Sequence, residues 1–168
     1  MKQIPLTQGR FALVDDEDYE ELNKYKWHAA WAPSTKSFYA ARNSKQINNS
    51  KRNTIYMHKE LLSPAKGMQV DHINHDTLDN RRGNLRIATL SENRANSRIQ
   101  ANSTSGYKGV TWNLRNNKWW SQIVVNCKHE YLGSFTCLMK AAAAYNRAAA
   151  KYHGEFACIN NIPYKFQN

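Results

Sequence analysis

Two short strand-like runs, separated by turn formers and followed directly by a helix start, constrain the fold of this chain more than any other feature. The runs are Gln69–Ile73 and Asn84–Ala88, and Asn, Asp and Gly residues lie between them. A hairpin is the simplest structure for two such runs. Thr89 and Glu92 then match a capping box, so a helix is predicted to begin at Leu90. The segment is therefore predicted to fold as strand, loop, strand and helix.

Four of the polar residues along this segment are candidates for one site, in the order Asp71, His72, Asn84 and Asn93. Phosphodiester hydrolysis needs a base that takes a proton from water and a cation that orients the phosphate and neutralises the charge on the departing oxygen. His72 titrates near neutral pH and can accept the proton. The Asp71 carboxylate and the Asn93 amide oxygen suit Mg²⁺ or Mn²⁺. The ordered set indicates a hydrolytic site, although each residue taken singly is more often structural.

The pleat of a strand affects how these groups can meet. Asp71 and His72 are adjacent, and a regular strand points adjacent side chains to opposite faces. We therefore expect a bend or a bulge in the hairpin at this point. His75, in the loop, is a weaker candidate for the base, and Asn96, one helical turn beyond Asn93, is a weaker candidate ligand.

Five short motifs in this region resemble the HNH nuclease family, and within it the homing endonucleases of phages. They are Tyr56-Met57-His58-Lys59, Asp71-His72-Ile73-Asn74, Leu78-Asp79-Asn80, Asn84-Leu85-Arg86 and Ser91-Glu92-Asn93. The resemblance implies a ββα-metal unit that hydrolyses DNA with one divalent cation. Asn93 stands where the family name has a second histidine, which argues against tight Zn²⁺ binding and favours Mg²⁺ or Mn²⁺.

The resemblance also implies a role for each residue at a matching position. His72 would be the general base, and Asn84 would either orient this base or brace the hairpin. Asp71 and Asn93 would hold the cation. His58, on a predicted helix, is a candidate neighbour of the site or a phosphate contact, and an ordinary structural histidine is the alternative. Arg86 and Arg94 are likewise candidate neighbours of the site or phosphate contacts. Arg81 and Arg82 are further candidate phosphate contacts. For all four arginines, ordinary solvated charge is the alternative to a phosphate contact.

Charge is unevenly distributed along the 168 residues. The formal net charge is +11 and the pI is about 9.7. Residues 1–50 carry seven Lys and Arg against six acidic residues, 51–100 nine against five, and 101–168 eight against two. This basic excess favours a polyanion as partner, with simple solubility as the alternative explanation. Nucleic acid fits better than a membrane, because no stretch approaches the length of a spanning helix.

The three cysteines, Cys127, Cys137 and Cys158, form no C-x-x-C pair, and their odd number argues against a closed disulfide framework. We therefore expect a reducing cytosol, inside the host cell of a phage or mobile element. The four-cysteine site that braces some HNH proteins has no counterpart here, so no structural zinc is expected. The first residues contain no apolar signal core.

The C-terminal third has a different pattern. A segment rich in Asn, Ser, Gln and Thr, from about residue 96 to 105, is typical of a linker. Three strand-like runs follow, at 107–112, 118–124 and 129–135. The alanine-rich stretch Leu138–Gly154 predicts a helix whose small-residue face can lie closely on a sheet, with the final glycine as its stop.

These runs resemble the plant ethylene-response-factor, or Apetala-type, DNA-binding domain. The shared motifs are Y-K-G-V, K-W, Y-L-G-S-F, A-A-A-Y-N-R-A-A and H-G-E-F-A-C-I-N, over about Ser105 to Asn160. In that family the exposed face of the sheet lies in the major groove of duplex DNA. The residues that fall on this reading face, or next to it, are Lys108, Thr111, Arg115, Trp120, Gln122, Val124, His129 and Tyr131.

This chain departs from the plant domain in two ways. Several arginines of the family appear here as Thr111, Val124 and His129, and the first turn is one residue longer. A different base preference is therefore expected. The aromatic residues of these strands could instead belong to the core, which we expect for Trp119 because it alternates with Trp120 along the strand.

Residues 1–53 carry the weakest functional signal. They predict strands at 11–14, 27–31 and 37–42 and a short acidic helix at 15–22. The acidic run that opens this helix complements a helix dipole more often than it binds a metal, and its sign argues against contact with DNA.

Together these patterns predict an α+β protein. Its parts are an N-terminal α+β part (1–53), an HNH nuclease domain (54–100), a linker (101–105), an Apetala-type domain with a three-stranded antiparallel sheet packed on one helix (106–160), and a tail (161–168). The expected activity is metal-dependent, site-specific nicking of duplex DNA by a monomer, with a homodimer as the alternative. The rival function is a sequence-specific DNA-binding regulator with an inactive HNH scaffold. An RNA-binding module is disfavoured because the sheet lacks a paired RNP-type aromatic signature.

Overall fold

The computed structural model describes residues 1–44, 53–100 and 102–166. Residues 45–52 of the predicted N-terminal part, residue 101 of the predicted linker and residues 167–168 of the predicted tail lie outside the described residues. Within the described ranges, none of the helices combines the length and the apolar character needed to cross a membrane.

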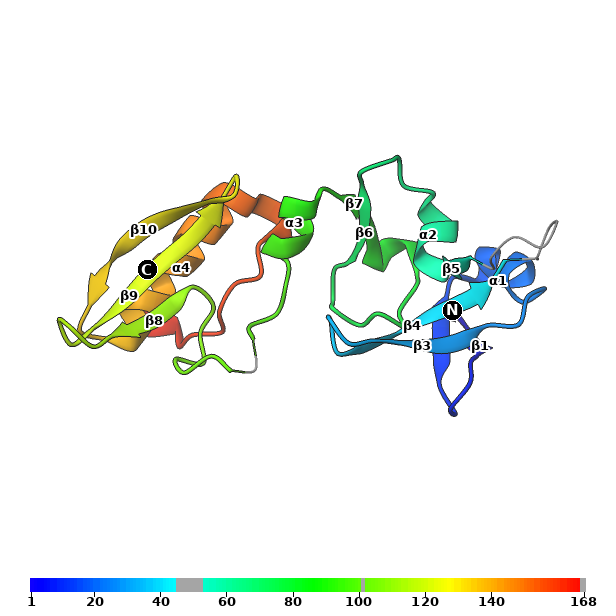
Figure 1. Cartoon of the computed structure of the whole chain (residues 1–168), viewed down its shortest axis with the longest axis horizontal. Helices are drawn as coiled ribbons and strands as arrows, with labels where there is room; N and C mark the ends of the chain where they lie inside the picture. Colours follow the sequence, from blue (N-terminus) through cyan, green and yellow to red (C-terminus); the bar gives the residue numbers. More distant parts are fainter. Residues whose placement is uncertain (45–52, 101, 167–168) are drawn as a thin grey trace. The chain divides into compact units, whose positions relative to one another are not determined.

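The chain has the predicted α+β composition and divides into two compact units (Figure 1). The first unit is Met1–Thr89 and the second is Leu90–Asn168. This division lies earlier in the chain than the predicted linker at 101–105. The reason is that the helix beginning at Leu90 packs against the long C-terminal helix of the second unit. Residues 1–53 and the hairpin region that follows them belong to one unit.

The first unit contains small antiparallel sheets and two short helices. Its elements are β1 (Lys2–Pro5), β2 (Phe11–Val14), α1 (Asp16–Leu22), β3 (His28–Ala32), β4 (Ser37–Asn43), β5 (Thr54–Tyr56), α2 (Met57–Leu62), β6 (Gln69–His72), the 3₁₀ turn η1 (Arg82–Asn84) and β7 (Leu85–Ala88). The strands pair as β1-β2, β3-β4-β5 and β6-β7. The strand predicted at 11–14 is confirmed, whereas β1 and β5 were not predicted. Both are too short to show a clear alternation of apolar residues.

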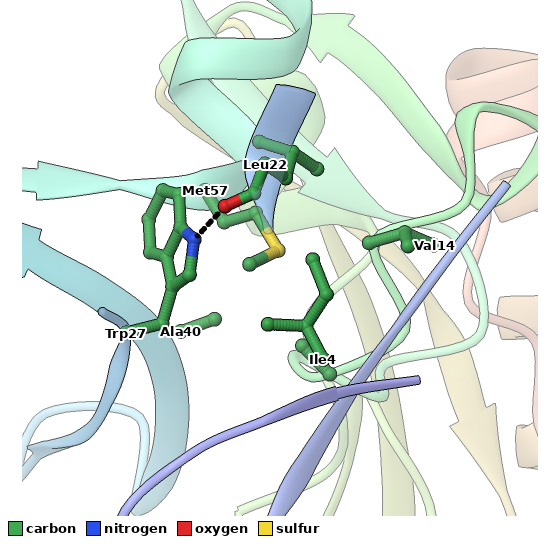
Figure 2. Packing of buried hydrophobic residues seen from close by; sticks show 7 residues of the cluster. Ile4, Val14, Leu22, Trp27, Ala40 and Met57 are labelled. Atoms are coloured by element: carbon green, nitrogen blue, oxygen red, sulfur yellow. Dashed lines mark hydrogen bonds between the residues drawn. The ribbon is translucent and has the colours of Figure 1, made fainter. Parts of the chain in front are cut away.

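One apolar core joins β1, β2, α1, β4 and α2 (Figure 2). Its buried members are Ile4, Ala12, Val14, Leu22, Trp27, Ala40 and Met57. The indole Nε1 of Trp27 donates a hydrogen bond to the Leu22 carbonyl at 2.8 Å, which satisfies the one polar atom of this large buried side chain. Met57 is the first residue of α2, so the N-terminal strands and the helix that carries His58 are held by the same core.

The β6–β7 hairpin keeps an unbroken register. Asp71 pairs with Arg86, and His72 pairs with Leu85. The Ile73 amide extends the ladder by donating to the Asn84 carbonyl at 2.9 Å. The predicted bend or bulge is therefore wrong for the paired residues. Asp71 and His72 point to opposite faces, and both are buried because each face has its own covering side chains.

The second unit is a three-stranded antiparallel sheet with a long helix on one face. Its elements are α3 (Leu90–Ala95), β8 (Val110–Asn113), β9 (Lys118–Val125), β10 (Lys128–Phe135), α4 (Leu138–His153) and the 3₁₀ turns η2 (Gly154–Phe156) and η3 (Tyr164–Phe166). The strand order is β10-β9-β8, and α4 runs along the sheet (Figure 1). The predicted start of α3 at Leu90 is confirmed. The predicted end of α4 is also confirmed, because Gly154 caps this helix with a φ of 52°.

Alanine allows α4 to lie close to the sheet. Ala141, Ala142 and Ala149 are fully buried against side chains of β8 and β9. Trp119 is among those that pack on α4, which confirms the expectation that it belongs to the core. The opposite face of the sheet is therefore left for other contacts.

Candidate active site and DNA-binding face

Asp71 forms a buried ion pair with the residue opposite it in the hairpin. The Nε and Nη2 atoms of Arg86 lie 2.9 Å and 2.8 Å from Oδ2 of Asp71. The side chains are only 12% and 6% exposed. Arg86, predicted as a neighbour of the site or a phosphate contact, thus lies directly on the candidate metal ligand. A cross-strand pair gives this contact its geometry, since opposed side chains share one face.

His72 lies on the other face, among aromatic rings. Its ring centroid is 5.2 Å from that of His58 and 6.1 Å from that of Tyr39. Burial lowers the pKa of His72, and the side chain of Asn80 together with nearby carboxylates, first among them Asp71, partly offsets this effect. His72 is therefore a neutral imidazole at neutral pH, which is the form that can accept a proton.

His58 completes the wall beside His72. It stacks on Tyr56 at 5.6 Å and lies 5.5 Å from Tyr39, and it is 6% exposed. Among the described residues, its Nδ1 atom has no hydrogen-bond partner. Burial, followed by the nearby His72, lowers the pKa of His58 to about 3. A buried neutral ring in contact with the candidate base fits a neighbour of the site better than a phosphate contact.

Asn84 acts on the loop between the two strands. Its Oδ1 atom accepts the Asn74 amide at 3.0 Å, and its Nδ2 atom donates to the Asp79 carbonyl at 2.8 Å. The amide is buried. Of the two roles that the resemblance implies, these contacts support bracing of the hairpin. Asn80 is the amide that contacts His72.

The loop is also held by the N-terminal strands, which sequence reasoning missed. The Leu13 amide donates to the Leu78 carbonyl at 2.9 Å, and the Asn80 amide donates to the Leu13 carbonyl at 2.8 Å. The Thr77 hydroxyl donates to the Phe38 carbonyl at 2.6 Å. These contacts, like those of Tyr39, join residues far apart in the sequence. No local pattern could have indicated them.

Two of the candidate phosphate contacts are engaged in ion pairs. Arg81 binds Asp79, which is 2% exposed on its side chain, with Nη2 to Oδ2 at 2.6 Å. Arg82 binds Asp18 of α1 through two hydrogen bonds, at 2.8 Å and 2.7 Å. These arginines hold the loop, so a structural role accounts for both. Arg94 lies exposed on α3.

Asn93 lies on α3 and therefore in the second unit. The weaker candidate Asn96 follows α3 in the same unit and is buried. Among the described residues, no group of three or more His, Cys, Asp or Glu side chains is arranged to hold a metal. A carboxylate and an amide oxygen, completed by water, are nonetheless the donor chemistry that Mg²⁺ accepts. Asp71, a buried carboxylate, fits that chemistry. Its sharing of an ion with Asn93 stays a proposal.

The predicted reading face in the second unit is assembled on the side of the sheet away from α4. Cross-strand pairs on this face are Thr111 with Trp120, Gln122 with Tyr131, and Val124 with His129. Trp120 is 39% exposed and Tyr131 61%. Their rings meet edge to face at 5.7 Å. Arg115 lies in the exposed turn between β8 and β9, where a shallow hollow is lined by Trp112, Asn113, Leu114, Arg115, Asn116 and Trp120.

Lys108 does not join this face. Its ammonium group donates to the carbonyl oxygens of Ala95 and Ser97, each at 2.6 Å. Burial lowers its pKa. The Asn160 side chain fixes the Lys108 backbone from the other side, accepting its amide at 2.7 Å and donating to its carbonyl at 3.0 Å. Lys108 therefore ties the end of α3 to the sheet-and-helix fold.

Comparison with known proteins identifies the region of the hairpin. A family model described as HNH endonuclease matches residues 63–95. An uncharacterized HNH endonuclease, L560, of Acanthamoeba polyphaga mimivirus is 29% identical over 157 residues, which cover 94% of this chain and 78% of that protein. Protein 3.8 of Escherichia phage T7 is 31% identical over 114 residues, covering 67% of this chain and 93% of that protein.

The C-terminal region is similar to a different group. The AP2-like ethylene-responsive transcription factor TOE2 of Arabidopsis thaliana is 44% identical over 59 residues, which cover 35% of this chain and 12% of the plant protein. The hairpin, its ordered polar residues and the matching family model define the protein as a nuclease. The chain belongs to the HNH endonuclease family, and its C-terminal region is of the AP2-like DNA-binding type.

Proposed function

We propose that this chain is a metal-dependent, site-specific endonuclease of homing type that hydrolyses phosphodiester bonds in duplex DNA. The observation that carries the proposal is the setting of His72: a buried imidazole, kept neutral, on the same hairpin as a buried carboxylate at Asp71. The proposed nuclease region is 54–100, linked through 101–105 to an AP2-type region at 106–160 that positions the cut.

In the proposed mechanism His72 accepts a proton from the attacking water. The rings of His58 and Tyr39 restrict its movement, and the Asn80 side chain favours the protonated form that results. Asn84 braces the loop beside it. A Mg²⁺ or Mn²⁺ ion held by Asp71 and Asn93 would supply Lewis-acid polarisation of the phosphate and stabilise the departing oxygen.

The exposed face of the sheet would position the DNA. Lys and Arg residues of the second region would add contacts with phosphates that do not depend on sequence. Base preference would come from Thr111, Gln122 and His129, with Trp120 and Tyr131 as the aromatic contacts. One catalytic hairpin attacks one strand at a time, so we propose that a monomer nicks its target.

Nicking of supercoiled plasmid that carries a candidate target tests the proposal. We expect nicks with Mg²⁺ or Mn²⁺ that disappear with chelator, and a loss of about a hundredfold or more in rate for His72→Ala, which removes the base. His153→Ala, a histidine at the end of α4, is the matched control and should nick normally. Mapping the ends on each labelled strand distinguishes a nick from a staggered double cut.

A regulator that binds DNA without cutting it is the second candidate. The similarity of the C-terminal region to a plant transcription factor is the observation that favours it. Plasmid that stays intact under all metal conditions, while the protein still shifts a duplex in a gel, would support the regulator. Competition of that shift by duplex RNA would instead support an RNA-binding module.

A further inference from the structure

The candidate metal ligand is already shared with a cation of the protein itself. Arg86 places two nitrogen atoms within 2.9 Å of one Asp71 oxygen, and the Asp71 side chain is buried while that of Arg86 is 12% exposed. The other arginines of the hairpin loop differ, because Arg81 and Arg82 are bound to Asp79 and Asp18, which are not candidate ligands. Among the described residues, Arg86 is the hairpin arginine paired with a residue of the proposed site.

A metal ion and a guanidinium group on one carboxylate repel each other. The repulsion is stronger in a buried setting than in water, because the surroundings screen it less. The ion pair of Arg86 with Asp71 therefore weakens the binding of Mg²⁺ or Mn²⁺ to the protein alone. It also holds the Asp71 side chain in place while no metal is bound.

A DNA phosphate removes this conflict. A phosphodiester is an anion, and the planar guanidinium can donate two parallel hydrogen bonds to it. The same phosphate offers an oxygen ligand of the kind that Mg²⁺ prefers. An arriving phosphate can thus take Arg86 from Asp71 and leave the carboxylate to the ion.

We infer that Arg86 couples metal binding to substrate binding by exchanging Asp71 for a DNA phosphate. The inference rests on the proposed function, which makes Asp71 a metal ligand. Because such coupling is reciprocal, DNA strengthens metal binding by the same factor by which metal strengthens DNA binding. The protein therefore binds the cation weakly until a phosphate backbone is in place. The metal-bound, active site then forms mainly in protein molecules that are bound to DNA.

Calorimetric titration with Mn²⁺ tests the coupling without measuring cleavage. The parent protein carries His72→Ala so that the DNA stays intact, and it is titrated alone and with a short duplex of mixed sequence at low salt. We expect the duplex to tighten Mn²⁺ binding by about fivefold or more. The variant Arg86→Gln should bind Mn²⁺ about fivefold more tightly than the parent without DNA, and should gain little from the duplex. Arg86→Lys keeps the positive charge and should stay close to the parent.

Two results would overturn the inference. One is that Arg86→Gln binds Mn²⁺ no more tightly than the parent in the absence of DNA. The other is that the parent has the same Mn²⁺ affinity with and without the duplex. If Arg86→Gln fails to fold by circular dichroism, the comparison of the parent with and without duplex decides alone. Titration of the duplex by itself and of Asp71→Asn gives the background. Mn²⁺ binding that Asp71→Asn leaves unchanged would contradict the proposed function, whereas binding lost in Asp71→Asn but insensitive to DNA would contradict only the coupling.

Discussion

Asp71 and His72 are neighbours in the chain and serve opposite faces of the same hairpin. Asp71 meets Arg86 across the strands, whereas His72 meets His58 and Tyr39. A shift of the β6–β7 register by one residue would exchange the two faces and place a carboxylate among the aromatic rings. The candidate site is therefore specified by strand register as much as by the identity of its residues.

The burial of His58 has a consequence for stability at acid pH. Its pKa is about 3 in the folded chain, against an ordinary value of 6.5. Below about pH 6.5, His58 binds a proton in the unfolded chain but not in the folded chain. The free energy of unfolding therefore falls as the pH is lowered towards 3. The slope for this one group approaches about 1.4 kcal/mol per pH unit.

Urea unfolding between about pH 5 and pH 7.5 measures this slope. We expect the slope of the free energy of unfolding against pH to be smaller in His58→Gln by roughly the contribution of one proton, because the amide does not titrate. His129→Gln, at an exposed position, is the control and should keep the slope of the parent chain. Equal slopes for His58→Gln and the parent would show that His58 is not the source.

At the scale of elements, α1 has a role that its charge alone does not explain. The sequence favours dipole complementation for its acidic run. In the structure Asp15 accepts the Arg82 amide at 2.8 Å, and Asp18 binds the Arg82 guanidinium. The acidic helix thus holds the loop between β6 and β7, next to Asn84. Its negative charge is used inside the first unit.

The approach of α4 to the sheet depends on Gly109. Its φ is +72°, and a Cβ atom there would overlap the Tyr145 ring and lie 2.5 Å from the Gln122 carbonyl oxygen. Neither the buried ring nor the strand backbone can give way cheaply. We expect Gly109→Ala to lower the free energy of unfolding of the second unit by about 3 kcal/mol or more, from overpacking and backbone strain together.

Gly106→Ala separates these two causes. Gly106 also has a positive φ, of 70°, but nothing lies within 4 Å of its Cβ position. This control should lose only about 1 kcal/mol, from strain alone. Denaturant unfolding of both variants checks the comparison, and equal losses would refute the steric account.

Across the whole molecule, the described residues of each unit form buried apolar clusters of their own. Ile4, Val14 and Trp27 belong to the core of the first unit, whereas Ala141 and Ile123 belong to clusters of the second. The charges differ too, since residues 1–89 contain 14 Lys and Arg against ten Asp and Glu, whereas residues 90–168 contain ten against three. The second unit therefore carries the stronger attraction for a polyanion.

Separate cores predict separate unfolding transitions. Ile4 is 1% exposed, so Ile4→Ala leaves a cavity and should lower the stability of the first unit by about 2–5 kcal/mol. The transition of the second unit should stay in place. Hydrogen exchange of amides in β2 and β9 along a denaturant series distinguishes the two, and a common shift of both would contradict independent cores.

Local sequence patterns were sufficient to predict many of the strands and helices and the donor chemistry of the candidate site. Turn formers and a capping box place a helix start at Leu90 after two strands, and alternation separates Trp119 from Trp120, because these signals act over a few residues. The ordered motif likewise indicated the HNH family, which the comparisons confirm.

The side chains that surround the candidate site could not be predicted in this way, because they are brought together by the packing of distant segments. Arg86 on Asp71, Tyr39 beside His72 and Asp18 on Arg82 are contacts between segments that are far apart in the chain or that depend on strand register. Lys108 is absent from the predicted reading face for the same reason, because its ammonium group binds the Ala95 carbonyl at the end of α3. Periodicity shows which face of an element is buried, but packing of whole elements selects the partner that covers it.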